Sequence, residues 1–481
     1  MNRIIDLTGD MCKTGIEPSL TINGLSYDSR KTKQGDLFIA LEGNNYDGNS
    51  YLEQAEHNGA IAILTSKIND KKINIPILQV EDTRVAMSKI AARYNNNPTE
   101  NINVIGVTGT NGKTTTVKII EHILNNSNLS SGSLGTLGFS TPSGIVSTGF
   151  TTPESVELHN MMKLLLESNI FNCVMEVSSH SLEMHRVDDV KYNTAVFTNL
   201  SQDHLDFHKN MEKYYSAKEK LFKMLDNNSC AVINIDDKMS NRLTGACKSK
   251  IITYGFSESA DIRVLNTRYS INSTHSMISV FGKEYEIYTK LLGEFNLYNV
   301  IASIASLVET VSIDQIVESI EAFEGVPGRT NKFFNKNKKV IVDYAHTPDA
   351  FNKIISTVRD MINPENKIIV IYGCGGNRDK NKRSEIGMIV DKKSDYSILC
   401  DDNPRDEDPD SIINSITNGY SSDNYITIRE RKEAIVYGIN MIKEGDILLV
   451  LGKGVEEFQE IQGSISPHSD IDTIKKYLDE I

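Results

Sequence analysis

Short apolar runs in this chain alternate with longer amphipathic stretches. NVIGVTG at residues 103–109, NCVMEV at 172–177 and AVFTNL at 195–200 have the length and composition of buried strands. TTTVKIIEHILNN at 114–126 has its apolar residues at helical spacing. Strands that alternate with helices are typical of a parallel sheet covered on both faces, so the pattern predicts an α/β fold.

Two breaks in this pattern divide the chain into three parts. NNNPTEN at 95–101 is polar and interrupted by proline, and EGVPGRT at 324–330 contains two glycines and a proline. Before the first break lie shorter strand-like runs, DLFIAL at 36–41 and AIAIL at 60–64. We therefore predict three domains, which comprise residues 1–98, 99–328 and 329–481.

The last part has four apolar runs, and a polar or glycine-rich signature follows each of them. They are VIVD before YAHTPDA, IIVIYG before CGGNRDK, YSILC before DDNPRDED, and ILLVLG before KGVEE. Ligands of open parallel sheets bind beyond the carboxyl ends of the strands. The four signatures are therefore expected to converge on one edge of one sheet and to form a binding face.

Composition and charge exclude several classes of protein. The 481 residues include 51 basic and 64 acidic ones, for a net charge of −13, and the one basic cluster, at 332–339, is interpreted as a solvated interdomain connector, so no nucleic-acid partner is expected. No apolar run approaches the roughly 20 residues of a membrane span. The N-terminus lacks the features of a signal peptide, which favours a cytoplasmic location without membrane insertion.

The six cysteines show no CxxC pair and no metal-ligand spacing, and are interpreted as reduced, mostly buried thiols in a reducing compartment. Cys374 lies in a glycine-rich turn, where an accessible thiol is conceivable, but no adjacent base marks it as a nucleophile.

GVTGTNGKT, residues 106–114, matches the phosphate-binding pattern G-x-x-x-x-G-K-[ST] between a predicted strand and a predicted helix. Backbone N–H groups of such a loop surround a phosphate, and the helix N-terminus adds partial positive charge. Lys113 is expected to reach the β- and γ-phosphates, and the Thr114 hydroxyl to bind Mg²⁺. The expected ATP-binding residues of the loop are Gly109, Thr110, Asn111, Gly112, Lys113, Thr114 and Thr115.

The loop alone leaves a signalling GTPase, a motor ATPase and a ligase open. The chain lacks an N-K-x-D-type base-reading signature and a strand that ends in D-x-x-G, which argues against a GTPase. Glu176 ends an apolar strand, and His204 lies in a D-H-L-D cluster. Because both follow predicted strands near the loop, we expect them to bind the metal ion.

At this point the chain resembles the Mur ligase family, the ATP-dependent amide-forming enzymes of peptidoglycan precursor synthesis. The resemblance rests on GVTGTNGKTTT, MEVSSH, FTNLSQDHLDFH, GEFNLYN, GVPGR, VDYAHTPDA, GCGGNRDK, DNPR and GKGVE, which span almost the whole chain. YAHTPDA, GCGGNRDK and DNPR are most similar to the members that add the third residue to UDP-N-acetylmuramoyl-L-Ala-D-Glu. The resemblance implies a small α/β UDP-binding domain, a central P-loop ATPase with a mainly parallel sheet, and a C-terminal Rossmann-like domain.

The resemblance also implies roles for individual residues. The UDP group would contact Ser29, Asn44, Asn45 and Tyr46, although Ser29 taken alone is better explained as a turn residue. The muramoyl peptide would contact Thr151, Thr152, Ser178 and Arg186. Adenine would contact Asn296 and Asn299, and the ribose and phosphates would contact Arg329, Asp343 and His346. Lys218 matches the lysine that the family carbamylates to N6-carboxylysine. The implied Mg²⁺ ligands are then Thr114, Glu176, His204 and Lys218, and the implied catalytic residues are Lys113, Lys218, Glu176 and His204.

The DNPR signature bears on the amino acid that is added. In the family, its arginine accompanies selection of meso-diaminopimelate, because a guanidinium pairs with the distal carboxylate and repels an ammonium. The expected contacts are Arg378, Asp402, Asn403, Arg405, Gly452 and Glu456. The family's G-K-G-H-E has Val455 in place of histidine here, and Met184 replaces a common glutamine. These departures keep a close analogue such as lanthionine open.

The resemblance implies a reaction through an acyl phosphate on the D-Glu γ-carboxylate, with ATP and Mg²⁺ and with small-molecule substrates. We expect a monomer, although no sequence feature specifies the oligomeric state. L-Lysine as the added amino acid is an alternative, as are other amide-forming members: the D-Glu-adding or D-Ala-D-Ala-adding ligases and folylpolyglutamate synthetase. A P-loop regulator that hydrolyses ATP without forming a bond is an alternative of a different class. It would leave the polar turns of the last domain without a role.

Overall fold

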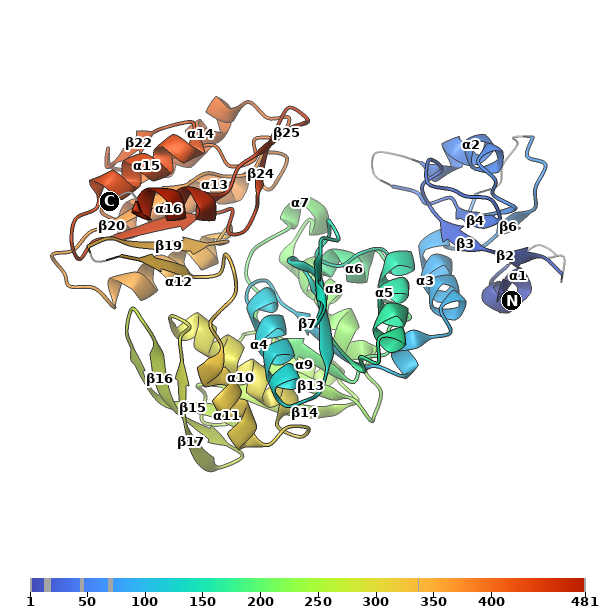
Figure 1. Ribbon diagram of the computed structural model, residues 1–481, viewed down its shortest axis with the longest axis horizontal. Coiled ribbons are helices and arrows are strands. Elements are labelled where there is room, and N and C mark those ends of the chain that lie inside the picture. Colours follow the sequence, from blue (N-terminus) through green and yellow to red (C-terminus); the bar gives the residue numbers. More distant parts are fainter. Residues whose placement is uncertain (1, 13–18, 44–46, 68–71, 336, 480–481) are drawn as a thin grey trace.

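The computed structural model describes residues 2–12, 19–43, 47–67, 72–335 and 337–479. Figure 1 shows three parts: the N-terminal part in blue and the C-terminal part in orange to red lie on opposite sides of the central part. Asn44, Asn45 and Tyr46 lie outside the described residues. No helix among those described is long and apolar enough to cross a membrane.

The N-terminal part is built on a four-stranded parallel sheet in the order β3-β4-β5-β6. Its strands are β3 (Gly24–Ser26), β4 (Asp36–Ile39), β5 (Ala62–Thr65) and β6 (Ile77–Gln79). A separate antiparallel pair joins β1 (Asn2–Arg3) to β2 (Thr21–Ile22). The helices are α1 (Ile4–Thr8), α2 (Leu52–His57) and α3 (Thr83–Tyr94), with short 3-10 turns at Gly9–Met11, Gly48–Tyr51 and Pro98–Glu100.

The central part contains an eleven-stranded sheet in the order β10-β9-β8-β11-β7-β12-β13-β14-β15-β16-β17. From β8 to β15 neighbouring strands are parallel, and hairpins extend both edges. The strands are β7 (Asn103–Thr108), β8 (Ser131–Gly135), β9 (Gly138–Thr141), β10 (Gly144–Val146), β11 (Asn172–Glu176), β12 (Thr194–Phe197), β13 (Cys230–Asn234), β14 (Lys250–Gly255), β15 (Ile262–Tyr269), β16 (Thr274–Val280) and β17 (Lys283–Thr289).

Helices cover both faces of this sheet, as the alternating pattern predicts. They are α4 (Lys113–Asn126), α5 (Ser155–Glu167), α6 (Ser179–Glu183), α7 (Leu205–His208), α8 (Met211–Lys223), α9 (Ser240–Ala246), α10 (Glu294–Leu307) and α11 (Ile313–Ala322). Ile105 of β7 packs in one core with Ile120 of α4 and Ile304 of α10, whereas Val104 packs in another with Leu165 of α5 and Phe222 of α8. Successive residues of β7 thus point to opposite cores.

The C-terminal sheet has the order β18-β19-β23-β20-β21-β22, and all its neighbours are parallel except β18 and β19. Its strands are β18 (Asn331–Phe334), β19 (Lys339–Asp343), β20 (Ile368–Tyr372), β21 (Tyr396–Leu399), β22 (Tyr425–Thr427) and β23 (Ile447–Leu451); a hairpin of β24 (Phe458–Ile461) and β25 (Ser464–Pro467) follows. The helices are α12 (Pro348–Arg359), α13 (Asn381–Lys393), α14 (Pro409–Thr417), α15 (Arg431–Met441) and α16 (Asp470–Asp479). The four polar signatures therefore do leave the same edge of one sheet.

One expectation was wrong, and one open point, the accessibility of Cys374, is decided. The basic cluster at 332–339 is not a solvated connector in its described part, because residues 332–334 of β18 pair with β19 and Lys332 Nζ donates to the carbonyls of Asn272 (2.7 Å) and Lys290 (2.7 Å). The aromatic Phe333 and Phe334 favour a strand over a loop. Cys374 is buried, not accessible, and burial raises the pKa of its thiol to about 12.

Candidate active site

The phosphate-binding loop depends on two glycines. Gly109 (φ +152°) directly follows β7, and Gly112 (φ +87°) directly precedes α4. A Cβ on Gly109 would lie 1.8 Å from Thr198 Oγ1, and one on Gly112 would lie 2.3 Å from Asn299 Oδ1. Only glycine fits both the backbone conformation and the space. The strand–loop–helix setting predicted for this segment is confirmed.

Two lysine side chains meet at one carbonyl of the loop. Lys113 Nζ donates to the carbonyls of Gly109 (3.0 Å) and Thr110 (2.9 Å), and Lys218 Nζ donates to Gly109 as well (2.8 Å). Lys218 is only 2% exposed, and its ammonium lies 4.6 Å from the centroid of the Tyr214 ring. Burial, and then repulsion from Lys113, hold the pKa of Lys218 well below its usual range.

Oxygen ligands suited to Mg²⁺ lie beside this pair. The Thr114 hydroxyl donates to Glu176 Oε1 (2.9 Å), and the Thr136 N–H donates to the same oxygen (2.8 Å). Arg329 Nη2 donates to Thr114 Oγ1 (3.1 Å). A carboxylate and a hydroxyl at this loop fit Mg²⁺, which prefers a few protein oxygens together with those of the phosphates.

His204 lies nearby, in a left-handed backbone conformation (φ +54°) at the start of α7. Its Nε2 is 3.3 Å from Asp203 Oδ2, and burial lowers the pKa of the imidazole to about 3. No group of three or more His, Cys, Asp or Glu side chains that could hold a metal ion occurs in the described part of the chain. The predicted metal set therefore depends on Thr114 and on modification of Lys218.

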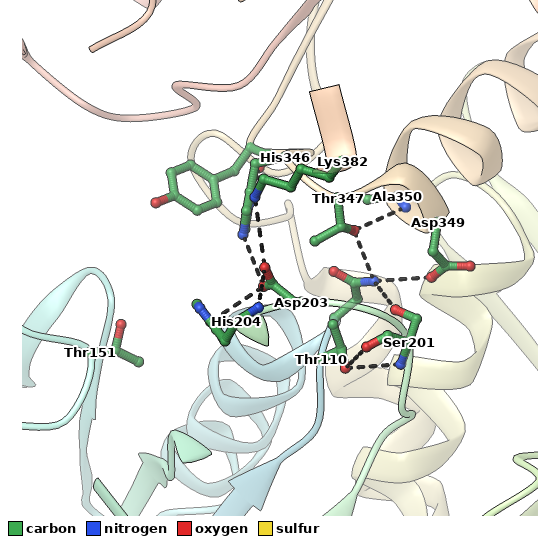
Figure 2. A network of polar contacts seen from close by, with 12 residues as sticks. Thr110, Thr151, Ser201, Asp203, His204, His346, Thr347, Asp349, Ala350 and Lys382 are labelled. Carbon is green, nitrogen blue, oxygen red and sulfur yellow. Dashed lines mark hydrogen bonds and ion pairs between the residues drawn. The ribbon is translucent and has the colours of Figure 1, made fainter. Parts of the chain in front are cut away.

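Asp203 joins the central and C-terminal parts (Figure 2). Its buried carboxylate lies 3.6 Å from His346 Nε2 and 3.7 Å from Lys382 Nζ, both in the C-terminal part. These partners, with His204, outweigh the effect of burial and hold the pKa of Asp203 well below its usual range. Nearby, Asn111 Nδ2 of the phosphate-binding loop donates to Asp349 Oδ2 (3.0 Å) of α12.

The expected adenine and ribose residues lie where the chain passes between these two parts. Asn299 Nδ2 donates to Asn296 Oδ1 (3.1 Å), and Asn296 Nδ2 donates to the Leu292 carbonyl (2.9 Å). Asp343 accepts N–H bonds from Thr330 and Ala345 (2.7 Å each), and its burial raises the pKa of its carboxyl. The two asparagines are buried beneath the loop.

Most residues expected to hold the muramoyl peptide gather at the end of β11. Thr152 Oγ1 donates to the Glu176 carbonyl (2.8 Å) and accepts from the Ser178 N–H (3.2 Å). Arg186 Nη1 donates to the Thr152 carbonyl (3.0 Å), and Thr151 Oγ1 lies 3.1 Å from Thr136 Oγ1. Ser29 is not part of this cluster: its hydroxyl donates to Gln54 Oε1 (2.8 Å) within the N-terminal part.

The residues expected to hold the amino acid lie on the turns after β20, β21 and β23. Asn403 is buried; its Nδ2 donates to Glu456 Oε2 (2.9 Å) and its Oδ1 accepts from Lys453 Nζ (3.0 Å). Arg405 Nη1 donates to the Gly376 carbonyl (2.7 Å), which connects two turns. Arg378 is exposed on the first of them. A Cβ on Gly452 would lie 2.8 Å from Asp402 Oδ2, which explains the glycine there.

Comparison with known proteins covers nearly the whole chain. Profiles of the Mur ligase family catalytic domain, the Mur ligase middle domain and the Mur ligase glutamate ligase domain match residues 21–100, 107–307 and 328–454. The UDP-N-acetylmuramoyl-L-alanyl-D-glutamate--2,6-diaminopimelate ligase of Aquifex aeolicus is 40% identical over 459 residues, which cover 95% of this chain and 94% of that protein. The chain belongs to the Mur ligase family.

Other Mur ligases support the same assignment. The Clostridium tetani protein of the same name is 38% identical over 469 residues, with 96% of each chain covered. A solved structure of an enzyme of that name is 28% identical, with a TM-score of 0.71, and covers 100% of this chain and 99% of its own. MurF from Acinetobacter baumannii shares the fold at 19% identity, with a TM-score of 0.68 and coverage of 99% and 97%.

Several polar residues of this Mur ligase site were missed by sequence reasoning. Asp203, Lys382 and Asp349 make contacts across the seam between the central and C-terminal parts. Asp203 is part of the D-H-L-D cluster and Asp349 is part of YAHTPDA, whereas Lys382 belongs to none of the quoted signatures. Arg383 is 1% exposed and makes two 3.0 Å contacts with Glu407, which connects the GCGGNRDK and DNPR segments. Arginines within helices usually lie on the solvated face, so no sequence pattern marked this pair.

Proposed function

We propose that this Mur ligase adds meso-2,6-diaminopimelate to the D-Glu γ-carboxylate of UDP-N-acetylmuramoyl-L-Ala-D-Glu. The similarity over nearly the full length to enzymes of that name supports the acceptor and the reaction. The position of Arg405 is the observation that supports diaminopimelate as the added amino acid, because its guanidinium lies at the binding edge of the C-terminal sheet. A guanidinium there suits a substrate whose distal end carries a carboxylate.

The reaction needs an activated carboxylate, because oxide is a poor leaving group. The γ-carboxylate oxygen of D-Glu attacks the γ-phosphorus of ATP, the bond to the bridging oxygen breaks, and ADP leaves. An amine of the diamino acid then attacks the resulting acyl phosphate, loses a proton, and expels phosphate to leave an amide. The Lys113 ammonium would stabilise the negative charge on the transferred phosphoryl group. Thr114 and Glu176 would hold Mg²⁺, which neutralises charge on the phosphates.

The seam between the central and C-terminal parts would bring the two half-reactions together. Asp203, His346 and Lys382 meet there beside the phosphate-binding loop (Figure 2). Their contacts join the domain with the nucleotide loop to the domain with the amino-acid turns. Such closure would keep water away from the acyl phosphate, which hydrolysis would otherwise destroy. We further propose domain boundaries at 98/99 and 328/329, which fall in the polar, proline-interrupted break at 95–101 and in the glycine- and proline-containing break at 324–330.

We also propose that Lys218 is carbamylated. Its buried amine is held beside Lys113 on one carbonyl, which disfavours a second positive charge. The neutral amine attacks the carbon of dissolved CO₂ and releases a proton, and the resulting carbamate carries a negative charge. This charge would pair with Lys113 and supply an oxygen ligand for Mg²⁺. A ¹³C NMR carbamate signal after exposure to ¹³C-bicarbonate, absent in Lys218→Arg, tests this; a wild-type spectrum without it refutes it.

Phosphate release from ATP with Mg²⁺ and UDP-N-acetylmuramoyl-L-Ala-D-Glu tests the reaction. meso-Diaminopimelate, lanthionine and L-lysine are offered separately, and the product mass is measured. Release that requires both the acceptor and diaminopimelate supports the proposal. Equal use of L-lysine contradicts the role of Arg405. Release without any acceptor would instead favour a nucleotide-hydrolysing regulator.

A further inference from the structure

The guanidinium of Arg405 is shared between two structural elements. Its backbone N–H donates to the Glu460 carbonyl (3.0 Å), and its own carbonyl accepts from Gln462 (2.7 Å), so the residue is fixed against the β24–β25 hairpin. Its Nε lies 3.2 Å from Glu460 Oε2, and Nη1 donates to the Gly376 carbonyl. Among the described residues Nη2 has no partner, and it remains free for a ligand carboxylate.

Glu460 differs from Glu456, the carboxylate that the resemblance assigns to the amino acid. Both contacts of Glu456 Oε2 are made inside the protein, with Asn403 Nδ2 (2.9 Å) and with the fully buried Lys453 Nζ (3.0 Å). Its Oε1 lies 3.5 Å from the Tyr344 hydroxyl. Lys453 therefore already neutralises much of the charge of Glu456.

The side chain of Glu460 is 33% exposed, and only its Oε2 is engaged. Its Oε1 has no hydrogen-bond partner in the described part of the chain. A carboxylate oxygen without a partner thus lies beside a guanidinium that also has a free nitrogen. The Glu460 carboxylate and the Arg405 guanidinium therefore form an ion pair, and each has an atom left to bind a ligand.

We propose that Glu460 and Arg405 together bind the distal centre of the amino acid, with Glu460 accepting from its ammonium and Arg405 donating to its carboxylate. This inference rests on the proposed function. An α-amino-acid centre carries both charges on one carbon, so it matches such a pair. L-Lysine has the distal ammonium alone, and L-2-aminopimelate has the distal carboxylate alone. Each would leave one member of the pair without its ligand contact.

The test compares Glu460→Gln with wild type on two substrates, meso-diaminopimelate and L-2-aminopimelate. Glutamine keeps the size of the side chain and an oxygen that accepts from Arg405 Nε, and it removes only the charge. Glu460→Gln is expected to raise KM for diaminopimelate about tenfold, as for the loss of one charge-assisted hydrogen bond, and not to raise KM for aminopimelate. KM for ATP stays unchanged.

Glu457→Gln is the matched control, since it removes the same charge from an exposed side chain at the start of the same hairpin. It is expected to leave both KM values unchanged. An equal rise in KM for both substrates in Glu460→Gln would mean that Glu460 only positions Arg405. A fall in KM for both would mean that Glu460 only competes with the ligand for Arg405. Either result, or an unchanged KM for diaminopimelate, overturns the inference. Failure of wild type to use diaminopimelate would instead refute the proposed function, and this inference with it.

Discussion

The phosphate-binding loop and the DNPR turn both follow a buried parallel strand at its carboxyl end, yet they present their charges differently. Lys218 and Glu176 beside the loop are 2% and 1% exposed, and backbone groups fix them. At the DNPR turn the side chain of Arg405 is 22% exposed and its counter-ion Glu460 33% exposed. Two of the groups expected to serve the nucleotide, Lys218 and Glu176, thus lie inside the protein, whereas Arg405 and Glu460, which we propose contact the amino acid, are partly exposed.

This difference follows from what each site has to do. Phosphoryl transfer gains most from charges fixed in a dry environment, where they act strongly and need no rearrangement. Selection among amino acids requires groups that exchange an internal partner for a ligand, and such groups must remain accessible. We therefore expect substitutions at the phosphate-binding loop to lower kcat, and substitutions at the DNPR turn to raise KM for the diamino acid.

Lys113→Ala should have the largest effect. The variant loses the positive charge that is expected to stabilise the transferred phosphoryl group, and kcat is expected to fall by about 10³-fold or more. Phosphate release under saturating substrates measures it, and an unchanged binding constant for diaminopimelate in calorimetry shows that the C-terminal turns are intact. A kcat within tenfold of wild type would contradict the role of Lys113.

Arg405→Ala should raise KM for meso-diaminopimelate by roughly 10- to 100-fold, as expected for the loss of charged hydrogen bonds worth about 1.5–3 kcal/mol. KM for ATP should change by less than about twofold, because no contact of Arg405 reaches the phosphate-binding loop. Steady-state kinetics with each substrate varied in turn check this. An equal rise in both KM values would remove the distinction between the two regions.

Acid should destabilise the central part at a higher pH than the C-terminal part. His159 of α5 is fully buried and has no hydrogen-bond partner among the residues that the structure describes, and burial lowers its pKa from 6.5 to about 4. The unfolded chain binds this proton more tightly, so stability is complete above about pH 6.5 and declines as the pH falls towards 4. By pH 5 the loss is about 2 kcal/mol.

His159→Leu should flatten this decline in urea unfolding, followed by circular dichroism at pH 7 and pH 5. Glu407→Gln is the contrasting variant, because hydrogen bonding to Arg383 lowers the pKa of Glu407 from 4.5 to about 2. Its carboxylate contributes stability above about pH 4.5, and this contribution is lost only as the pH falls towards 2. The same pH dependence in wild type and His159→Leu would show that His159 does not contribute.

Asn111→Ala should have the smallest effect. It removes a hydrogen bond between the phosphate-binding loop and Asp349 of the C-terminal part, and KM for ATP is expected to rise only a few-fold. A double-mutant cycle with Asp349→Ala should give a coupling of about 0.5–1 kcal/mol. A coupling of zero would mean that the hydrogen bond between Asn111 and Asp349 does not help to join the central and C-terminal parts.

Much of the fold could be predicted because its signals are local. The run 103–109 and the helix after it required only residue spacing, and both occur as β7 and α4. The four turns of the C-terminal sheet converge because parallel strands share an edge. The segment 332–339 was misjudged, since its lysines suggested solvent while its two phenylalanines form a strand that pairs with β19.

The candidate site could be predicted only in part, and the reason is sequence separation. Lys113, Thr114 and Glu176 follow from a loop pattern and a strand end, and they lie together as expected. Lys382 and Asp349 lie far along the chain from Asp203 and Asn111, which they contact. No pattern in the neighbouring sequence predicts these two contacts. Arg383 was missed because a helix lysine–arginine run has the composition of a solvated face.

The sequence by itself determined the strands, the glycines of the loop and the kinds of charged groups available, because these depend on neighbours within a few residues. Only the tertiary structure decided which groups lie together: Lys113 with Lys218 on one carbonyl, Asp203 with His346 and Lys382 of the C-terminal part, and Arg405 with Glu460. Burial and electrostatic pairing depend on contacts between distant segments. Those contacts set the pKa of each group and decide which of its hydrogen-bond donors and acceptors are left for a ligand.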